Sequence, residues 1–163
     1  MRMLCRAVTA AATCLALAVP ASVAAASPPI PGLHLRDVIS RLTAQGLTCS
    51  GGRRLEDTVP GWTCTRSTPA IAYSVVILGS GGPAIIRVDA QVTVFAGAVD
   101  PPARAFLGRL ATLPYTGAQP VRARAWTRRY LGTRRHRAFG PAAYRLQTTR
   151  LARFLVITGR PPA

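Results

Sequence analysis

The stretch IRVDAQVTV, residues 86–94, alternates without a break between apolar and polar side chains. Because successive side chains of a β-strand point to opposite faces, this alternation predicts a strand whose buried face begins at Ile86. The continuous apolar run YSVVIL at residues 73–78 is typical of a central strand. Between the two, GSGGP at residues 79–83 supplies the glycines and proline of a turn. These strands are the expected centre of the fold.

The residues before this centre predict a helix and a hairpin. Apolar side chains recur at the i, i+3, i+4 and i+7 spacing of an amphipathic helix, at Leu35, Val38, Ile39 and Leu42. Gly46 followed by Leu47 is typical of a left-handed helix end with its hydrophobic contact. Short strands are expected around Cys49 and Cys64, joined by a polar loop over residues 50–61.

The residues after the centre predict two helices and two more strands. Asp100 is expected to cap a helix that carries Pro101 at its first position and stops at Pro114. Its apolar face consists of Phe106, Leu107, Leu110 and Leu113. A further helix is expected over residues 120–131, before Gly132. A basic loop at residues 133–141 and a final pair of strands at 144–148 and 153–158 complete the expected elements.

The order helix, strands, helices, strands predicts one small α+β domain. Its sheet should be mainly antiparallel, with two or three helices on one face. The domain is expected over residues 33–158, after a flexible Pro-rich leader at 27–32 and before a loose tail at 159–163. The roughly 137 residues from 27 onward are enough for a single domain that buries about two-thirds of its unfolded surface.

Residues 1–26 have the pattern of a secretory signal peptide. Arg2 and Arg6 precede an Ala-rich apolar run, and small residues lead up to Ala26. A lipid anchor would need a cysteine at the cleavage point, whereas Cys14 lies inside the run, and no Arg-Arg pair marks a twin-arginine route. The run is only marginally long for a retained anchor, and Pro20 interrupts it. We therefore expect Sec-type export, cleavage near Ala26, an extracellular location and no transmembrane segment afterwards.

Only Cys49 and Cys64 remain after that cleavage. In an exported chain, an isolated pair of cysteines predicts one disulfide bond. A zinc site is disfavoured, because no second cysteine pair is nearby and His34 and His136 are distant in sequence. No metal or other cofactor is predicted.

Charge is distributed very unevenly along the chain. Residues 27–100 carry six Arg and five acidic residues, for a net charge of +1, whereas residues 101–163 carry thirteen Arg and no acid, for a net charge of +13. The chain has no Lys and no Asn, a composition typical of a GC-rich genome. Codon usage explains why Arg replaces Lys, but it does not explain why acids are missing from one half. Such an asymmetry bears on partners rather than on fold.

The candidate binding residues are the arginines between positions 122 and 137. They are Arg122, Arg124, Arg128, Arg129, Arg134, Arg135 and Arg137. Arginine presents a planar fork that binds phosphate or carboxylate in a bidentate manner. Trp126 and Tyr130 lie among these residues, and either could stack on a base or sugar if exposed. Helical spacing favours both rings as core residues, and a solvated basic face without a specific partner is the alternative interpretation of the cluster.

Two short motifs resemble known signals. LPYTG at residues 113–117 resembles the sortase signal, Leu-Pro-any-Thr-Gly, which is cut between Thr and Gly and attached to the cell wall. That signal needs a following membrane-spanning stretch of about 20 apolar residues, whereas 46 residues rich in Arg follow here. The segment is therefore expected to be a helix stop and a turn.

GSGGP at residues 79–83 resembles the serine motif of trypsin-like proteases, Gly-Asp-Ser-Gly-Gly-Pro, with Leu78 and Gly79 in place of the first two residues. The chain is too short for that two-barrel fold and lacks the Ala-Ala-His-Cys segment of such enzymes. A serine without a base to deprotonate it is not a nucleophile at neutral pH. A hairpin turn is the expected role.

Side chains for general acid–base catalysis are few. His34 is expected at the start of the first helix, and His136 lies among arginines. Glu56 and Asp57 are adjacent, so they would point apart on an extended segment. The sequence thus predicts a secreted, non-enzymatic protein that binds an anionic polymer or surface, such as a teichoic acid, an anionic lipid or a nucleic acid. The alternatives are a protein–protein interaction module or inhibitor that uses the sheet or the Cys49–Cys64 loop, and a small hydrolase with an unrecognised site.

Overall fold

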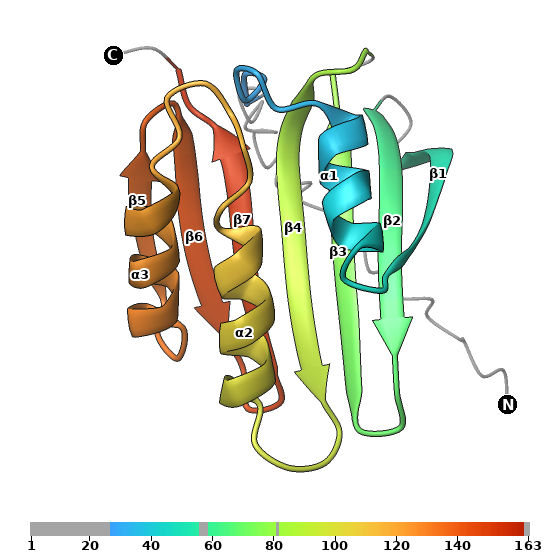
Figure 1. The fold of residues 1–163 in the computed structure, drawn as a ribbon, viewed down its shortest axis with the longest axis vertical. Coiled ribbons are helices and arrows are strands. Elements are labelled where there is room, and N and C mark those ends of the chain that lie inside the picture. Colours follow the sequence, from blue (N-terminus) through green and yellow to red (C-terminus); the bar gives the residue numbers. More distant parts are fainter. Residues whose placement is uncertain (1–26, 56–58, 81, 162–163) are drawn as a thin grey trace, which may run out of the picture.

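The computed structural model describes residues 27–55, 59–80 and 82–161. Its elements are α1 (Leu35–Thr43), β1 (Thr48–Leu55), β2 (Val59–Ser67), β3 (Ile71–Gly79), β4 (Ile85–Val94), α2 (Asp100–Leu110), α3 (Pro120–Tyr130), β5 (Arg135–Phe139), β6 (Ala142–Thr148) and β7 (Ala152–Gly159). The strands form one seven-stranded sheet in the order β1-β2-β3-β4-β7-β6-β5, and every neighbouring pair is antiparallel. All three helices lie on the same face of this sheet (Figure 1). The predicted α+β class is therefore confirmed.

The two predicted central strands are β3 and β4, which pair along most of their length. Val88, Ala90, Val92 and Val94 are buried, as the alternation predicts, but the first buried residue is Ile85 rather than Ile86. A register shift next to Gly79 causes this difference. Leu78 pairs with Arg87 and Gly79 pairs with Ile85, so Ile86 is an extra residue of β4, and this β-bulge reverses the alternation before Arg87.

The apolar run of β3 is buried on one face only. Val75 and Ile77 are in the core, whereas Val76 and Leu78 are half-buried on the opposite face. A continuous apolar run is typical of a strand covered on both faces. Here the helices cover one face, so the run leaves apolar side chains on the other.

Helix α1 ends as its sequence predicts. Gly46 has a φ of +79°, the N–H of Leu47 donates to the carbonyl of Leu42 over 3.1 Å, and the N–H of Gly46 donates to the carbonyl of Thr43 over 2.8 Å. These two bonds satisfy carbonyls that the last helical turn would leave unpaired. Leu47 is itself buried and directly precedes β1.

Cys49 and Cys64 form the predicted disulfide between β1 and β2. By restricting the unfolded chain, a bridge across a loop of this length stabilises a domain by about 3 kcal/mol. The predicted polar loop over residues 50–61 is wrong, because β1 and β2 pair as far as Leu55 and Val59. Trp62 lies across Gly51 of the opposite strand, where a Cβ would collide with the indole, and the strand register shifts directly after this glycine.

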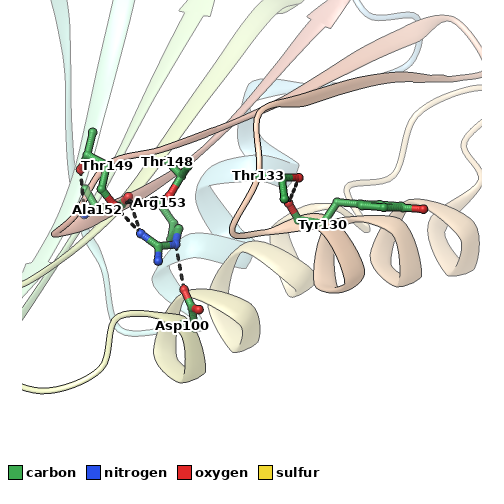
Figure 2. Close-up of polar contacts among 7 residues, drawn as sticks. All are labelled: Asp100, Tyr130, Thr133, Thr148, Thr149, Ala152 and Arg153. Atoms are coloured by element: carbon green, nitrogen blue, oxygen red, sulfur yellow. Dashed lines mark hydrogen bonds and ion pairs between the residues drawn. The ribbon is translucent and has the colours of Figure 1, made fainter.

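Asp100 does not cap α2, although the helix begins where predicted. It is the first helical residue, after Val99, and no side chain caps this end. Its carboxylate instead accepts a hydrogen bond from Nε of Arg153 on β7 over 2.8 Å, and Nη1 of Arg153 donates to the carbonyl of Thr149 over 2.6 Å (Figure 2). The Arg153 side chain is only 12% exposed. The predicted cap is wrong because the Asp100 carboxylate binds Arg153, a residue distant in sequence, instead of the helix N-terminus.

The predicted basic loop over residues 133–141 is also wrong, since most of it is the edge strand β5. Phe139 pairs with Ala142, so Gly140 and Pro141 form a two-residue turn, and Gly140 has the positive φ of +60° that such turns favour. Four of the five β5 residues are exposed. Charged side chains are compatible with a strand at a sheet edge, where they prevent unwanted pairing.

The proline-rich residues 27–32 contact the sheet. Ile30 is 1% exposed within the core, and its N–H donates to the carbonyl of Ile85 over 2.7 Å. The carbonyl of Pro31 accepts a hydrogen bond from the N–H of Thr116 over 2.8 Å. The segment expected to be a flexible leader therefore supplies one core side chain.

Candidate anion-binding site

All seven candidate arginines are exposed and lie at one side of the sheet. Arg122, Arg124, Arg128 and Arg129 lie on α3, Arg134 precedes β5, and Arg135 and Arg137 lie on β5. Helix α3 packs over the β5 edge, where the rings of Trp126 and Phe139 are 5.7 Å apart (Figure 1). Arg135 and Arg137 pair with the buried residues Leu146 and Tyr144, so both point to the helix-covered face.

The structure brings three of these arginines together around a groove between α3 and β5. The groove has a volume of about 320 Å³ and is lined by Arg122, Ala125, Trp126, Arg129, Tyr130, Arg137 and Phe139. Two guanidinium groups come from α3 and the third from β5. We call this the arginine groove.

Aromatic rings form the floor of the arginine groove. Trp126 is 7% exposed and Phe139 is 2% exposed, so both rings belong to the core, as helical spacing favours for Trp126. Tyr130 is half-buried, and the guanidinium carbons of Arg129 and Arg135 lie 5.4 and 5.7 Å from its ring centre. These cation–π contacts orient the guanidinium groups. They also occupy the Tyr130 ring, which leaves the groove better suited to anionic groups than to a stacked base.

The remaining candidates lie outside the groove. The side-chain stems of Arg124 and Arg128 cross Gly108 of α2, where a Cβ would be 3.1 Å from Cγ of Arg128. Small residues at such a crossing let two helices approach closely. These two arginines therefore have a packing role between α2 and α3 in addition to their charge.

A second, smaller hollow of about 190 Å³ gathers cations at the end of β5 and β6. It is lined by Arg134, Arg135, His136, Arg145, Leu146 and Gln147. Arg145 was not among the predicted residues, because it lies on a strand whose pattern only indicates burial of its neighbours. It joins the cluster through its pairing with His136 across the two strands.

The guanidinium groups of the arginine groove have no acidic neighbour among the described residues. The three ion pairs formed within those residues are Arg36–Asp37, Arg87–Asp89 and Arg153–Asp100. In the groove, Nη1 of Arg122 donates to Oε1 of Gln119 over 3.2 Å. A positive field that neighbouring carboxylates do not neutralise attracts anions to this face.

The LPYTG segment is folded into the domain. Leu113 and Tyr115 are buried, and the Tyr115 hydroxyl donates to the carbonyl of Phe139 over 2.8 Å. The Tyr144 hydroxyl donates to the carbonyl of Ala111 over 3.2 Å and lies 3.4 Å from the Tyr115 hydroxyl. Burial raises the pKa of both phenols, so both are neutral and structural at ordinary pH.

Because Leu113 and Tyr115 are core residues, we expect Thr116→Ala to leave the distribution of the protein between culture medium and cell wall unchanged. Sortase recognition needs an extended, accessible segment, whereas here Leu113 and Tyr115 are buried and the N–H of Thr116 donates to the carbonyl of Pro31. Fractionation and immunoblotting of cells producing the wild type or the variant measure this directly. Loss of a covalently wall-bound fraction in the variant would show that the segment is a functional sorting signal.

Neither histidine lies in a catalytic arrangement with the described residues that line its hollow. His34 shares its hollow with Leu35, Arg36 and Pro83, and His136 shares its own with cationic and neutral side chains. The hydroxyl of Ser80, in the GSGGP turn, donates to the carbonyl of Ala84 over 3.5 Å. Glu56 and Asp57 lie outside the described residues.

In the part of the chain that the structure describes, no group of three or more His, Cys, Asp or Glu side chains is arranged to hold a metal ion. None of the helices in this part is long and apolar enough to cross a membrane. The chain also matches no protein-family model, no curated protein and no solved structure.

Proposed function

We propose that this protein is exported by a signal peptide cleaved near Ala26 and binds anionic polymers or surfaces outside the cell through its arginine-rich side. One observation carries the proposal. Arg122, Arg129 and Arg137 come from two separate elements and surround one groove with an aromatic floor. The proposed role is non-enzymatic, since binding alone accounts for the arrangement.

The chemistry of the groove favours phosphate or carboxylate groups. Each guanidinium offers two parallel N–H donors to such a group, and charge-assisted bonds of this kind are about twice as strong as neutral ones. The buried rings of Trp126 and Phe139 keep water away from one side of the groove. The cation–π contacts reduce the conformational freedom that the arginine side chains lose on binding.

A repeating anion suits this surface better than a single ion. Cations continue from the groove to the second hollow, where Arg134, Arg135 and Arg145 lie. Teichoic acids, anionic lipid headgroups and extracellular nucleic acids all present phosphates in series. Phosphate in series is therefore the proposed ligand chemistry, and the source is distinguished by experiment.

The salt dependence of binding tests this function. With inorganic polyphosphate as the probe, the logarithm of the association constant should fall linearly with the logarithm of salt concentration, by about 0.7 to 0.9 per phosphate neutralised. Contacts from the three groove arginines alone predict a slope of about −2 to −3, and contacts from all seven candidates predict about −5 to −6. Isothermal titration calorimetry over a salt series measures the slope.

A flat salt dependence would contradict the proposal and favour the interaction-module alternative, because such interfaces depend much less on released counterions. Parallel titrations with teichoic acid, anionic vesicles and single-stranded DNA identify the source of the phosphates. Equal slopes with different affinities would mean that the groove recognises phosphate and that other contacts select the polymer.

A further inference from the structure

Three connections meet at one end of the sheet, at the bottom of Figure 1. They are residues 68–70 between β2 and β3, residues 95–99 between β4 and α2, and residues 149–151 between β6 and β7. The N–H of Phe95 donates to the carbonyl of Ala70 over 2.8 Å, and the N–H of Val94 donates to the carbonyl of Leu151 over 2.9 Å. These bonds join the three connections into one surface, which we call the loop end.

The loop end exposes large apolar side chains. Phe95 is 62% exposed and Leu151 is 55% exposed. Among the described residues they are two of the three exposed large hydrophobic side chains, and the third is Val121 on α3. All four residues from Phe95 to Ala98 are exposed, and a Cβ on Gly97 would meet nothing within 4 Å. Such a run of exposed apolar residues is unfavourable in water unless a partner covers it.

The polar groups of the loop end are already hydrogen-bonded within the domain. Oγ1 of Thr68 and Oγ1 of Thr149 accept hydrogen bonds from backbone N–H groups three residues later, over 3.1 and 3.0 Å. The carbonyl of Thr149 accepts from Arg153, whose Nε donates to Asp100 (Figure 2). A protein partner needs about one hydrogen bond per 100–200 Å² of interface. The loop end offers few groups for such bonds, whereas a bilayer favours surfaces whose polar groups are satisfied internally.

The border of the loop end is cationic. Arg150 lies within it and Arg104 lies on the first half of α2, and both are exposed. Neither takes part in the three ion pairs formed within the described residues. The carboxylate of Asp100, at the start of α2, is paired with Arg153 at 2.8 Å. This charge complements anionic lipid headgroups.

We propose that the loop end docks onto an anionic bilayer, with the Phe95 and Leu151 side chains at the boundary between headgroups and acyl chains. Arg104 and Arg150 contact lipid phosphates at the same time, because an arginine keeps its charged end among the headgroups while its stem lies against apolar groups. Interfacial binding strengthens with the apolar area buried and with the attraction to anionic lipids, and the loop end supplies both.

Docking also brings a second cationic hollow to the membrane. Arg135 pairs with Leu146, so the hollow lined by Arg134, Arg135 and Arg145 lies near the turn at residues 149–151 that follows β6. In the docked molecule this hollow lies beside the headgroups, which makes lipid one source of the phosphates. The role of the hollow rests on the proposed function, whereas docking by the apolar side chains does not.

Fluorescence quenching by lipids with brominated acyl chains tests the insertion, with vesicles of phosphatidylcholine and phosphatidylglycerol. Phe95→Trp and Leu151→Trp should each add an emission component that the brominated lipids quench, above the background of Trp62 and Trp126 in the wild type. Val121→Trp is the matched control, because Val121 is 80% exposed in the first turn of α3, at the end of that helix remote from the loop end (Figure 1). Its added component should stay unquenched.

Cosedimentation with vesicles measures the strength of docking. Phe95→Ala and Leu151→Ala should each lower the partition coefficient by about five- to tenfold, because each removes apolar surface that insertion takes out of water. Arg104→Gln and Arg150→Gln should each lower it by about fivefold on anionic vesicles, and neither should lower it on pure phosphatidylcholine. Val121→Ala should have no effect. Circular dichroism should be unchanged in all five variants, since the replaced side chains are exposed.

A wild type that does not bind anionic vesicles would overturn the inference, and a protein pocket would then be the remaining partner for the loop end. Bound protein in which Phe95→Trp and Leu151→Trp add no quenched component would also overturn it, because adsorption through the arginine-rich side would explain the binding. An equal loss of binding in Val121→Ala would have the same consequence.

Polyphosphate titrations separate this inference from the proposed function. Phe95→Ala and Leu151→Ala should keep the affinity and the salt slope of the wild type, because the arginine groove is not part of the loop end. A protein that inserts into vesicles but does not bind polyphosphate would contradict the proposed function alone. A protein that binds polyphosphate but does not insert would contradict this inference alone.

Discussion

Replacing Arg122, Arg129 and Arg137 by Glu is expected to weaken polyphosphate binding by about 10³-fold or more at low salt. The three side chains line one groove, and a charge-assisted hydrogen bond contributes about 1.5 to 3 kcal/mol. The salt slope should also become shallower by about 2 to 3, since three phosphate contacts are lost. Titration calorimetry over a salt series gives both values. The fold should be retained, because all three residues are exposed.

Two matched triple reversals show whether the groove or the total charge matters. Arg124, Arg128 and Arg134 are candidate residues outside the groove, and Arg41, Arg104 and Arg150 are exposed elsewhere. We expect the first set to reduce affinity by a smaller factor, and the second set to have the least effect. If all three variants lose affinity equally, only net charge acts and there is no site. If none loses affinity, the arginine-rich side is not a binding surface.

Tyr144→Ala is expected to lower the free energy of unfolding by about 3 to 5 kcal/mol, the range for truncating a large buried aromatic side chain. Tyr144 is fully buried, its ring lies 5.1 Å from that of Phe139, and its hydroxyl donates to the carbonyl of Ala111. Tyr144→Phe keeps the ring and should cost only about 1 to 2 kcal/mol for the lost hydrogen bond. Urea unfolding followed by circular dichroism measures both losses. Equal effects of the two variants would mean that the hydroxyl, not the packing of the ring, supports this part of the core.

The buried phenols of Tyr115 and Tyr144 make the stability of the fold sensitive to alkaline pH. Burial is the main cause that raises the pKa of Tyr144 and of Tyr115 above the ordinary value of 10.0. Below pH 10 their contribution to stability is complete, and it is lost as pH rises further, because the unfolded chain releases these protons more readily. In the wild type, the phenolate absorbance of these two residues should therefore appear together with unfolding, which links the core around Tyr144 to the pH limit of the fold.

The candidate site was only partly visible in the sequence. The absence of acids after residue 100 and the run of arginines from 122 to 137 indicate a cationic surface without any structural information. They do not show that Arg137 joins Arg122 and Arg129 while Arg124 turns toward α2. Which arginines line the groove depends on the side of α3 that faces β5. Helical spacing predicts that side only where apolar residues recur along the helix. Arg145 joins the cationic cluster because strand pairing places it beside His136, and no local sequence pattern predicts that pairing.

The sequence by itself determined the features that depend on neighbouring residues. The period-two alternation from Val88 to Val94, the helical stripe at 35–42, the Gly46 helix end and the pairing of the last two cysteines all appear as predicted. Each rests on backbone geometry or chemistry that acts over a few residues, or on there being a single possible partner.

Only the tertiary structure decided the features that depend on distant partners. Residues 135–139 look like a loop in isolation, and they become a strand because β6 offers its free edge. Asp100 looks like a helix cap and instead binds Arg153, which lies 53 residues further along the chain. The bulge that buries Ile85 in place of Ile86 arises where β4 meets the end of β3. In each case the deciding contact joins residues of two separate elements, so it forms only after the chain has folded back on itself.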